Sequence, residues 1–136
     1  MADRPINRVT VEDIADFRAH PRLDRYQRLA TRSAIYPGKG TPVGLTYVAL
    51  KLNGEAGELA EHVGKAMRDD GHGVSAEGLT PERRAQIIRE AGDILWYLAA
   101  LCEEMDIGLD YTAAGNLAKL ADRTARGKLQ GEGDNR

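Results

Sequence analysis

Apolar residues recur at steps of three and four along two long stretches of the chain, which predicts two long amphipathic helices. The first stretch runs from Leu45 to about Arg68, with the stripe Leu45, Val48, Ala49, Leu52, Ala56, Leu59, Val63 and Met67. The second follows Thr80, Pro81 and Glu82, which are typical of an N-cap and a first helical turn. Its stripe is Ile87, Ala91, Ile94, Leu95, Leu98, Cys102 and Met105, and we expect Gly108 to end it.

Shorter helices are predicted before the first long stretch. Thr10 resembles an N-cap followed by an acidic first turn, so we expect a helix from there to about Ala19. A second short helix is expected from Asp24 to Ser33. The segment Tyr36–Gly44 contains two prolines and three glycines, which predicts a loop.

A last helix is predicted from Asp110, as its cap, to about Ala125, with Leu117 and Leu120 pointing inward. The segment Asp69–Leu79 interrupts the helical period between the two long stretches. Residues 126–136 hold too much glycine and charge to belong to a packed core.

No stretch alternates in the manner of a strand, so the predicted fold class is all-α. The 136 residues fit one domain, residues 1–136, with N-terminal helices in 1–33, central helices in 45–125 and a tail in 126–136. The connection between the long helices is short enough to favour antiparallel packing. Because two helices cannot enclose a core by themselves, we expect a homodimer or homotetramer that completes a four-helix bundle.

The composition and charge of the chain limit the classes of function that it can have. The net charge is −2 with both signs mixed, which gives no support for binding nucleic acid. Cys102 is the single cysteine, so a disulfide within the chain is excluded and a reducing compartment is expected. No segment has the length and apolar character of a membrane span or a signal peptide. We therefore expect a cytoplasmic protein that does not bind membranes.

Each long helix carries two acids three residues apart, Glu55 with Glu58 and Glu90 with Asp93. At about 100° per residue, the members of a pair lie about 60° apart and ~4.5 Å apart along the axis, so they share a face. That face borders the apolar stripe. Glycines beside the acids lower helix propensity by about 1 kcal/mol each and leave room for close approach.

If the two helices pack antiparallel through their stripes, the acidic pairs meet along one edge. Four carboxylates without cations would repel one another, and a divalent ion resolves that conflict. Oxygen ligands favour Mg²⁺, or Mn²⁺, and Mg²⁺ commonly takes phosphate oxygens as further ligands, which indicates a phosphorylated substrate. The competing interpretation is a solvated acidic face, because acids at this spacing are frequent on helix surfaces.

These residues resemble the MazG-like, all-α nucleoside triphosphate pyrophosphohydrolases, whose signature is E-x-x-E on one helix and E-x-x-D on the next. Here the signature reads EAGE at 55–58 and EAGD at 90–93, and the segment NLAKLADRTARG is similar to a later part of the family. The similarity extends from about Thr31 to the C-terminus. Gly54 stands where many members have a glutamate, and the connection between the motifs is longer than usual.

The resemblance implies Mg²⁺-dependent hydrolysis of a nucleoside or deoxynucleoside triphosphate to the monophosphate and pyrophosphate. It implies that Glu55, Glu58, Glu90 and Asp93 are the catalytic, metal-holding residues, and that one glutamate orients the attacking water. It also implies that Asn116, Lys119 and Arg123 of the last helix bind the substrate.

Several neighbouring residues have more than one interpretation. His62 lies on the acidic edge, where a polar neighbour is the expected role and a metal ligand the alternative. Lys51 and Lys65 flank the same edge, with surface solvation expected and charge balance or a phosphate contact left open. Tyr97 shares the face of the second acidic pair, and Trp96 is assigned to packing or a subunit contact.

Two other functions stay open at this point. One is a non-catalytic helical interaction protein with a solvated acidic face. The other is a metalloenzyme that acts on a different phosphorylated compound. A di-iron site of the ferritin type is disfavoured because the second motif has no histidine, and GKGTPVG lacks the spacing of a P-loop.

Overall fold

The computed structural model describes residues 9–70 and 78–128, and all regular structure in these ranges is helical. The all-α class predicted from the sequence is therefore confirmed for the described ranges. None of these helices combines the length and apolar character needed to cross a membrane. The elements are α1 (Val11–Ala19), α2 (Leu23–Ala30), the 3₁₀ helix η1 (Thr31–Ser33), α3 (Pro42–Asp69), α4 (Pro81–Glu104) and α5 (Leu109–Ala125).

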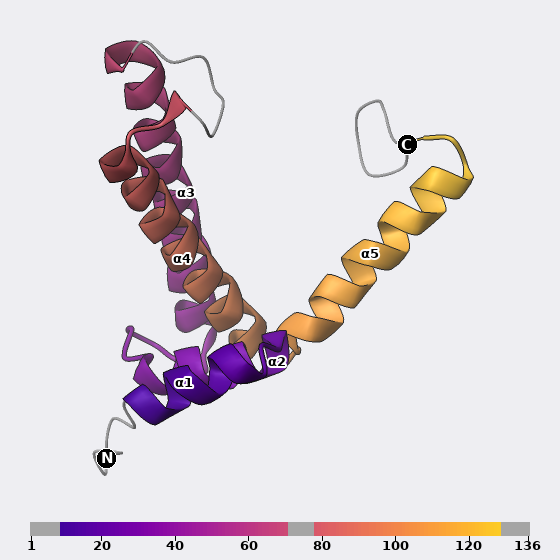
Figure 1. Cartoon of the computed structure of the whole chain (residues 1–136). Helices are drawn as coiled ribbons and strands as arrows, with labels where there is room; N and C mark the ends of the chain where they lie inside the picture. Colours follow the sequence, from indigo (N-terminus) through magenta and orange to yellow (C-terminus); the bar gives the residue numbers. More distant parts are fainter. Residues whose placement is uncertain (1–8, 71–77, 129–136) are drawn as a thin grey trace.

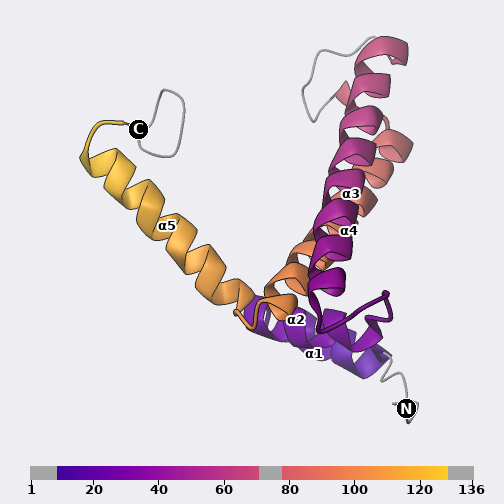
Figure 2. The ribbon, with the colours of Figure 1, turned by 180° about the vertical axis from the view of Figure 1, so that it is seen from behind.

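The long helices α3 and α4 lie side by side and run in opposite directions, as predicted (Figure 1 and Figure 2). Their most buried side chains are small, among them Val48 and Ala66 of α3 and Ala99 and Ala100 of α4. Because the distance between packed helices depends on the side chains at the contact, small residues let the two backbones come close. This pair is the frame to which the other helices attach.

Helices α1 and α2 lie across the end of the pair where α3 begins and α4 ends (Figure 1). Two polar contacts fasten this end. The indole Nε1 of Trp96 donates to the Ala30 carbonyl at 3.1 Å, and the Tyr36 hydroxyl donates to the Glu104 carboxylate at 2.6 Å. Burial and the Glu104 carboxylate raise the pKa of Tyr36, so the hydroxyl keeps its proton and remains a donor. Trp96 therefore packs within the chain.

The start of α3 corrects one prediction, because the helix begins at Pro42 and includes Gly44. The Thr41 hydroxyl accepts from the Val43 amide at 3.3 Å, and Pro42 occupies the first turn, where no amide donor is needed. A Cβ on Gly44 would lie 2.4 Å from the Gly38 carbonyl oxygen. This glycine is needed for close packing of the loop on the helix, so reading it as part of the loop was wrong.

The connection between α4 and α5 corrects two more predictions. α4 ends at Glu104, and the chain reverses at Asp106, whose φ of 53° lies in the left-handed region that aspartate tolerates. Gly108 is the N-cap of α5, and Asp110 lies in its first turn without capping it. Gly108 therefore does not end α4, because the turn has already been made at an aspartate.

Helix α5 leads away from the α3–α4 pair after its first turns, which contact α2 and α4 (Figure 2). Leu117 and Leu120, expected to point inward, are 67% and 40% exposed. That expectation is wrong for a single chain. Helical periodicity shows that the two leucines share a face, but it does not show what covers the face.

Two predictions extend beyond the described residues. The interruption expected at Asp69–Leu79 includes 71–77, and the tail expected at 126–136 includes 129–136. Within the described part, Asp69 is the last residue of α3 and Arg126 is the C-cap of α5.

The buried Gln27 of α2 holds the α4–α5 connection in place. Its Nε2 donates to the Ile107 carbonyl at 3.0 Å, and its Oε1 accepts from the Leu109 amide at 2.7 Å. Gln27 is 6% exposed, and Leu109 beside it belongs to the core cluster with Cys102. Both backbone groups lie outside the regular helical bonding pattern, so the glutamine supplies partners that the helices do not.

We expect Gln27→Leu to lower the free energy of unfolding by about 1–3 kcal/mol, because the Leu109 amide and the Ile107 carbonyl lose their buried partners. Urea unfolding followed by circular dichroism measures the change. Gln86→Leu is the matched control, since Gln86 accepts a bond from Arg83 of its own helix, and it should shift the value by less than about 0.5 kcal/mol. Equal losses in the two variants would contradict the role of Gln27.

Candidate functional site

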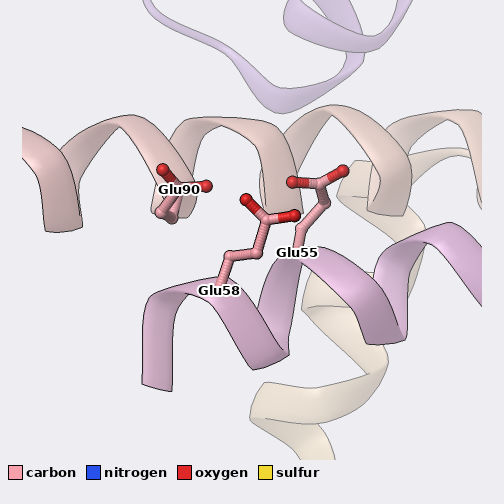
Figure 3. Close-up of side chains that lie close together, drawn as sticks. All are labelled: Glu55, Glu58 and Glu90. Atoms are coloured by element: carbon pink, nitrogen blue, oxygen red, sulfur yellow. The ribbon is translucent and has the colours of Figure 1, made fainter. Parts of the chain in front are cut away.

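Three carboxylates from the two long helices gather at one edge of the α3–α4 pair. Glu55 and Glu58 extend from α3 towards α4, and Glu90 extends from α4 to meet them (Figure 3). One carboxylate oxygen from each residue lies within 4.8 Å of the other two. Three of the four acids in the predicted site are therefore brought together by the antiparallel packing.

Burial differs among the three acids. The side chains of Glu55 and Glu90 are 12% and 13% exposed, whereas Glu58 is exposed to solvent. This matches the position predicted beside the apolar stripe, because a residue at the border of the stripe is partly covered by the facing helix. The group thus has an inner side at Glu55 and Glu90 and an open side at Glu58.

A cation stands at the Glu55 end of the group. The Lys51 Nζ lies 3.4 Å from the Glu55 Oε1, one helical turn earlier on α3. The same Nζ is 5.9 Å from the centre of the Tyr97 ring, so the lysine lies between a carboxylate and an aromatic face. The interaction with Glu55 raises the pKa of Lys51, which keeps the ammonium charged at neutral pH. Of the three roles left open for Lys51, the structure favours charge balance.

His62 stands at the Glu90 end. Its Nε2 lies 3.6 Å from the Glu90 Oε1, so it contacts the group across the helix pair without joining it as a fourth close donor. Its Nδ1 is buried and has no hydrogen-bond partner in the described ranges. The contact with Glu90 is that of a polar neighbour, but the buried Nδ1 is not satisfied as such a neighbour would be, so the role of His62 stays a prediction.

Asp93 is exposed and is not among the acids of the described ranges whose oxygens meet within 4.8 Å. Its charge acts on Tyr26 of α2, where burial first and Asp93 second raise the pKa of the tyrosine. Burial raises the pKa of Tyr97 too, and both Glu55 and Asp93 add to that rise, so Asp93 acts on the ring that also borders the glutamates. The assignment of Asp93 as a metal-holding residue stays a prediction. The sequence gives no signal for Tyr26, because only the packing of α2 on α4 brings it close.

The residues predicted to bind substrate lie on α5. Asn116 and Lys119 are exposed and Arg123 is buried. The helix that carries them, α5, leads away from the α3–α4 pair (Figure 1). Their substrate-binding role also stays a prediction.

Comparison with known proteins identifies the relatives of this chain. Residues 45–127, which include all four predicted acids, match the MazG nucleotide pyrophosphohydrolase domain. The chain belongs to the MazG nucleotide pyrophosphohydrolase family. The gene 37 protein of Mycobacterium phage L5 is 44% identical over 117 residues, which cover 84% of this chain and 98% of that protein. No solved structure matches significantly.

The donor set of the site fits the divalent metal ions that MazG proteins generally use. Three carboxylates offer hard oxygen ligands only, which suit Mg²⁺ or Mn²⁺ and disfavour softer ions. Their separation also matters, because three anions within 4.8 Å need positive charge nearby. Glu55, Glu58 and Glu90 are therefore the residues that would hold an ion in this MazG domain.

We expect MgCl₂ or MnCl₂ to raise the melting temperature of the protein, since an ion that binds only the folded state adds about 2.7 kcal/mol at 100 times its Kd. Glu58→Gln should remove most of this rise, and without metal it should melt no lower than the parent because repulsion is relieved. Circular dichroism or scanning calorimetry measures both effects.

Glu61→Gln is the matched control for the melting experiment, because Glu61 is exposed on the same helix and pairs with Lys65 outside the group. It should keep the full rise. An unchanged metal response in Glu58→Gln would show that these carboxylates do not hold the ion.

Proposed function

We propose that this protein is a Mg²⁺-dependent pyrophosphohydrolase that cleaves a nucleoside or deoxynucleoside triphosphate to the monophosphate and pyrophosphate. The observation that carries the proposal is the meeting of Glu55, Glu58 and Glu90 from two helices within 4.8 Å. It occurs inside the segment that matches the MazG domain. Hydrolases of phosphoric anhydrides need this kind of charge arrangement, because their catalysis is mostly positioning and electrostatic stabilisation.

The three glutamates have different places in the proposed reaction. Glu55 and Glu90, which are largely covered, would hold the metal ion from opposite helices, and Glu58 would hold it from the open side. When bound, Mg²⁺ neutralises phosphate charge and lowers the pKa of coordinated water. Glu58 faces solvent on the open side, so it is the carboxylate placed to orient the attacking water and accept its proton. Water adds across the bond between the α- and β-phosphates, and pyrophosphate leaves.

A second copy of the chain is part of the proposal. Within one chain, Asn116, Lys119 and Arg123 lie on a helix that leads away from the glutamates (Figure 1). Amide and cationic side chains suit sugar and phosphate oxygens, so they would serve the site of a partner chain. The substrate would then lie between the acidic edge of one protomer and α5 of the other.

Exposed apolar side chains on three helices support this assembly. They occur on α3, α4 and α5, and their exposed fractions reach 74%. An amphipathic helix that leaves its apolar residues uncovered has a face that a partner can bury. The residues are Leu50 and Met67 of α3, Ile88 and Leu95 of α4, and Tyr111, Leu117 and Leu120 of α5.

We expect Glu58→Gln and Glu90→Gln to keep the fold and to lower turnover at least about 100-fold, because each removes a charge that acts in the transition state. Pyrophosphate release, measured over the common and damaged nucleoside triphosphates with Mg²⁺ present, gives the rates. Asp93→Asn belongs in the same series and should also abolish turnover if this acid joins the metal site when substrate binds.

Glu61→Gln should retain the parental rate, since Glu61 pairs with Lys65 outside the group. If the Glu58→Gln variant releases pyrophosphate at the parental rate, Glu58 is not a catalytic residue. Absence of pyrophosphate release from every triphosphate in the parent protein would favour a non-catalytic interaction protein or a different phosphorylated substrate.

We expect the protein to be a dimer or tetramer in solution, and Leu117→Asp to shift it towards the monomer, because a charge on the exposed face of α5 resists burial against a partner. Size-exclusion chromatography with light scattering measures the mass. Ala118→Asp adds the same charge about 100° around the helix and should leave the assembly intact. A monomeric parent protein would contradict the proposed shared site.

A further inference from the structure

The three glutamates are bracketed by two nitrogen-bearing side chains from α3. Lys51 contacts Glu55 at 3.4 Å, and His62 contacts Glu90 at 3.6 Å. The picture of the group shows Glu58 between the other two carboxylates (Figure 3). The row therefore runs from a permanent cation, through three acids, to a histidine that is charged only when protonated.

The lysine end of the row supplies a permanent positive charge, the ammonium of Lys51. The ammonium of Lys51 lies against the more buried side of the group, where Glu55 is 12% exposed. Without a metal ion, this contact offsets part of the repulsion among the three carboxylates. Lys51 thus supplies, beside Glu55, part of the positive charge that a bound metal ion would supply.

The lysine is placed so that it can leave this position without disturbing the fold. Its side chain is 42% exposed, and its four-carbon stem lets the ammonium reach water. The Tyr97 ring, 5.9 Å from Nζ, offers a second attractive surface close by. No backbone change in α3 is required for the ammonium to swing away from Glu55.

A bound ion and the Lys51 ammonium compete for the same carboxylate. Mg²⁺ binds carboxylate oxygens at about 2.0–2.1 Å. An ammonium 3.4 Å from one oxygen of the same carboxylate repels a divalent charge held by that carboxylate, so the Lys51–Glu55 contact opposes binding of the ion. The strength of that contact enters directly into the apparent metal affinity.

We propose that Lys51 is an internal counter-ion that holds Glu55 in the metal-free protein and competes with the divalent ion for this carboxylate. The inference rests on the proposed function, because the ion is the one assigned there to Glu55, Glu58 and Glu90. It adds a residue outside the acidic motifs that sets how tightly the metal binds. Lys51 is a positioning residue in this scheme, since it acts on the site through Glu55.

The test is Mn²⁺ binding to the full chain, measured by isothermal titration calorimetry and by the loss of the free Mn²⁺ signal in electron paramagnetic resonance. We expect Lys51→Met to lower the Kd for Mn²⁺ about three- to tenfold at constant ionic strength, because a competing charge is removed. Lys51→Arg keeps the charge and should stay within about twofold of the parent. Circular dichroism melts confirm that each variant is folded.

Lys65→Met is the matched control, because it removes the same charge from an (i, i+4) pair on the same helix, where Lys65 contacts Glu61 at 2.6 Å. It should leave the Kd for Mn²⁺ within about twofold of the parent. If Lys51→Met binds Mn²⁺ as the parent does, or more weakly, Lys51 does not compete with the ion and the inference is overturned. If the parent protein itself binds no Mn²⁺, the proposed metal site fails and the inference fails with it.

Discussion

The close antiparallel contact between α3 and α4 is the constraint on which the other features depend. The most buried side chains of the two helices are small, such as Val48 and Ala66 of α3 and Ala100 of α4, and small side chains allow the backbones to approach. The same approach brings Glu90 of α4 to Glu55 and Glu58 of α3. A bulkier contact would separate the helices and with them the carboxylates. The geometry of the site is therefore a property of the helix interface.

This arrangement places three carboxylates close together, where they repel one another. Two nitrogen-bearing side chains lie beside them. Lys51 and His62 stand at the two ends of the row of acids. The Lys51 ammonium offsets part of the repulsion among the carboxylates. The close approach of the three carboxylates thus causes both their mutual repulsion and the proposed affinity for a divalent ion.

The direction of α5 has a different physical basis. Gln27 and the left-handed turn at Asp106 fix where the helix starts, and beyond its first turns α5 leads away from the α3–α4 pair (Figure 2). Leu117 and Leu120 of α5 are left exposed, and so are apolar positions on α3 and α4. A helix of this length gains most of its stability from packing an amphipathic face, so an uncovered face favours assembly. Placing Asn116, Lys119 and Arg123 at the site of a second copy would give both the apolar face and the polar residues a role.

The sequence by itself determined the helical class, the capped starts at Thr10 and Thr80, and the pairing of acids beside each apolar stripe, because these depend on spacing along one helix. It also contained the MazG motifs, because each motif is a short pattern of residues within one helix. Tertiary structure decided which acids meet, because Glu55, Glu58 and Glu90 come within 4.8 Å of one another across two helices. It also brought Tyr26 of α2 close to Asp93. It also decided that Gly44 lies inside a helix, that Asp106 makes the turn, and that Leu117 is exposed. Periodicity gives the angle of a residue around its own helix, but the distance between helices and the cover of a face are set by packing between segments far apart in the chain.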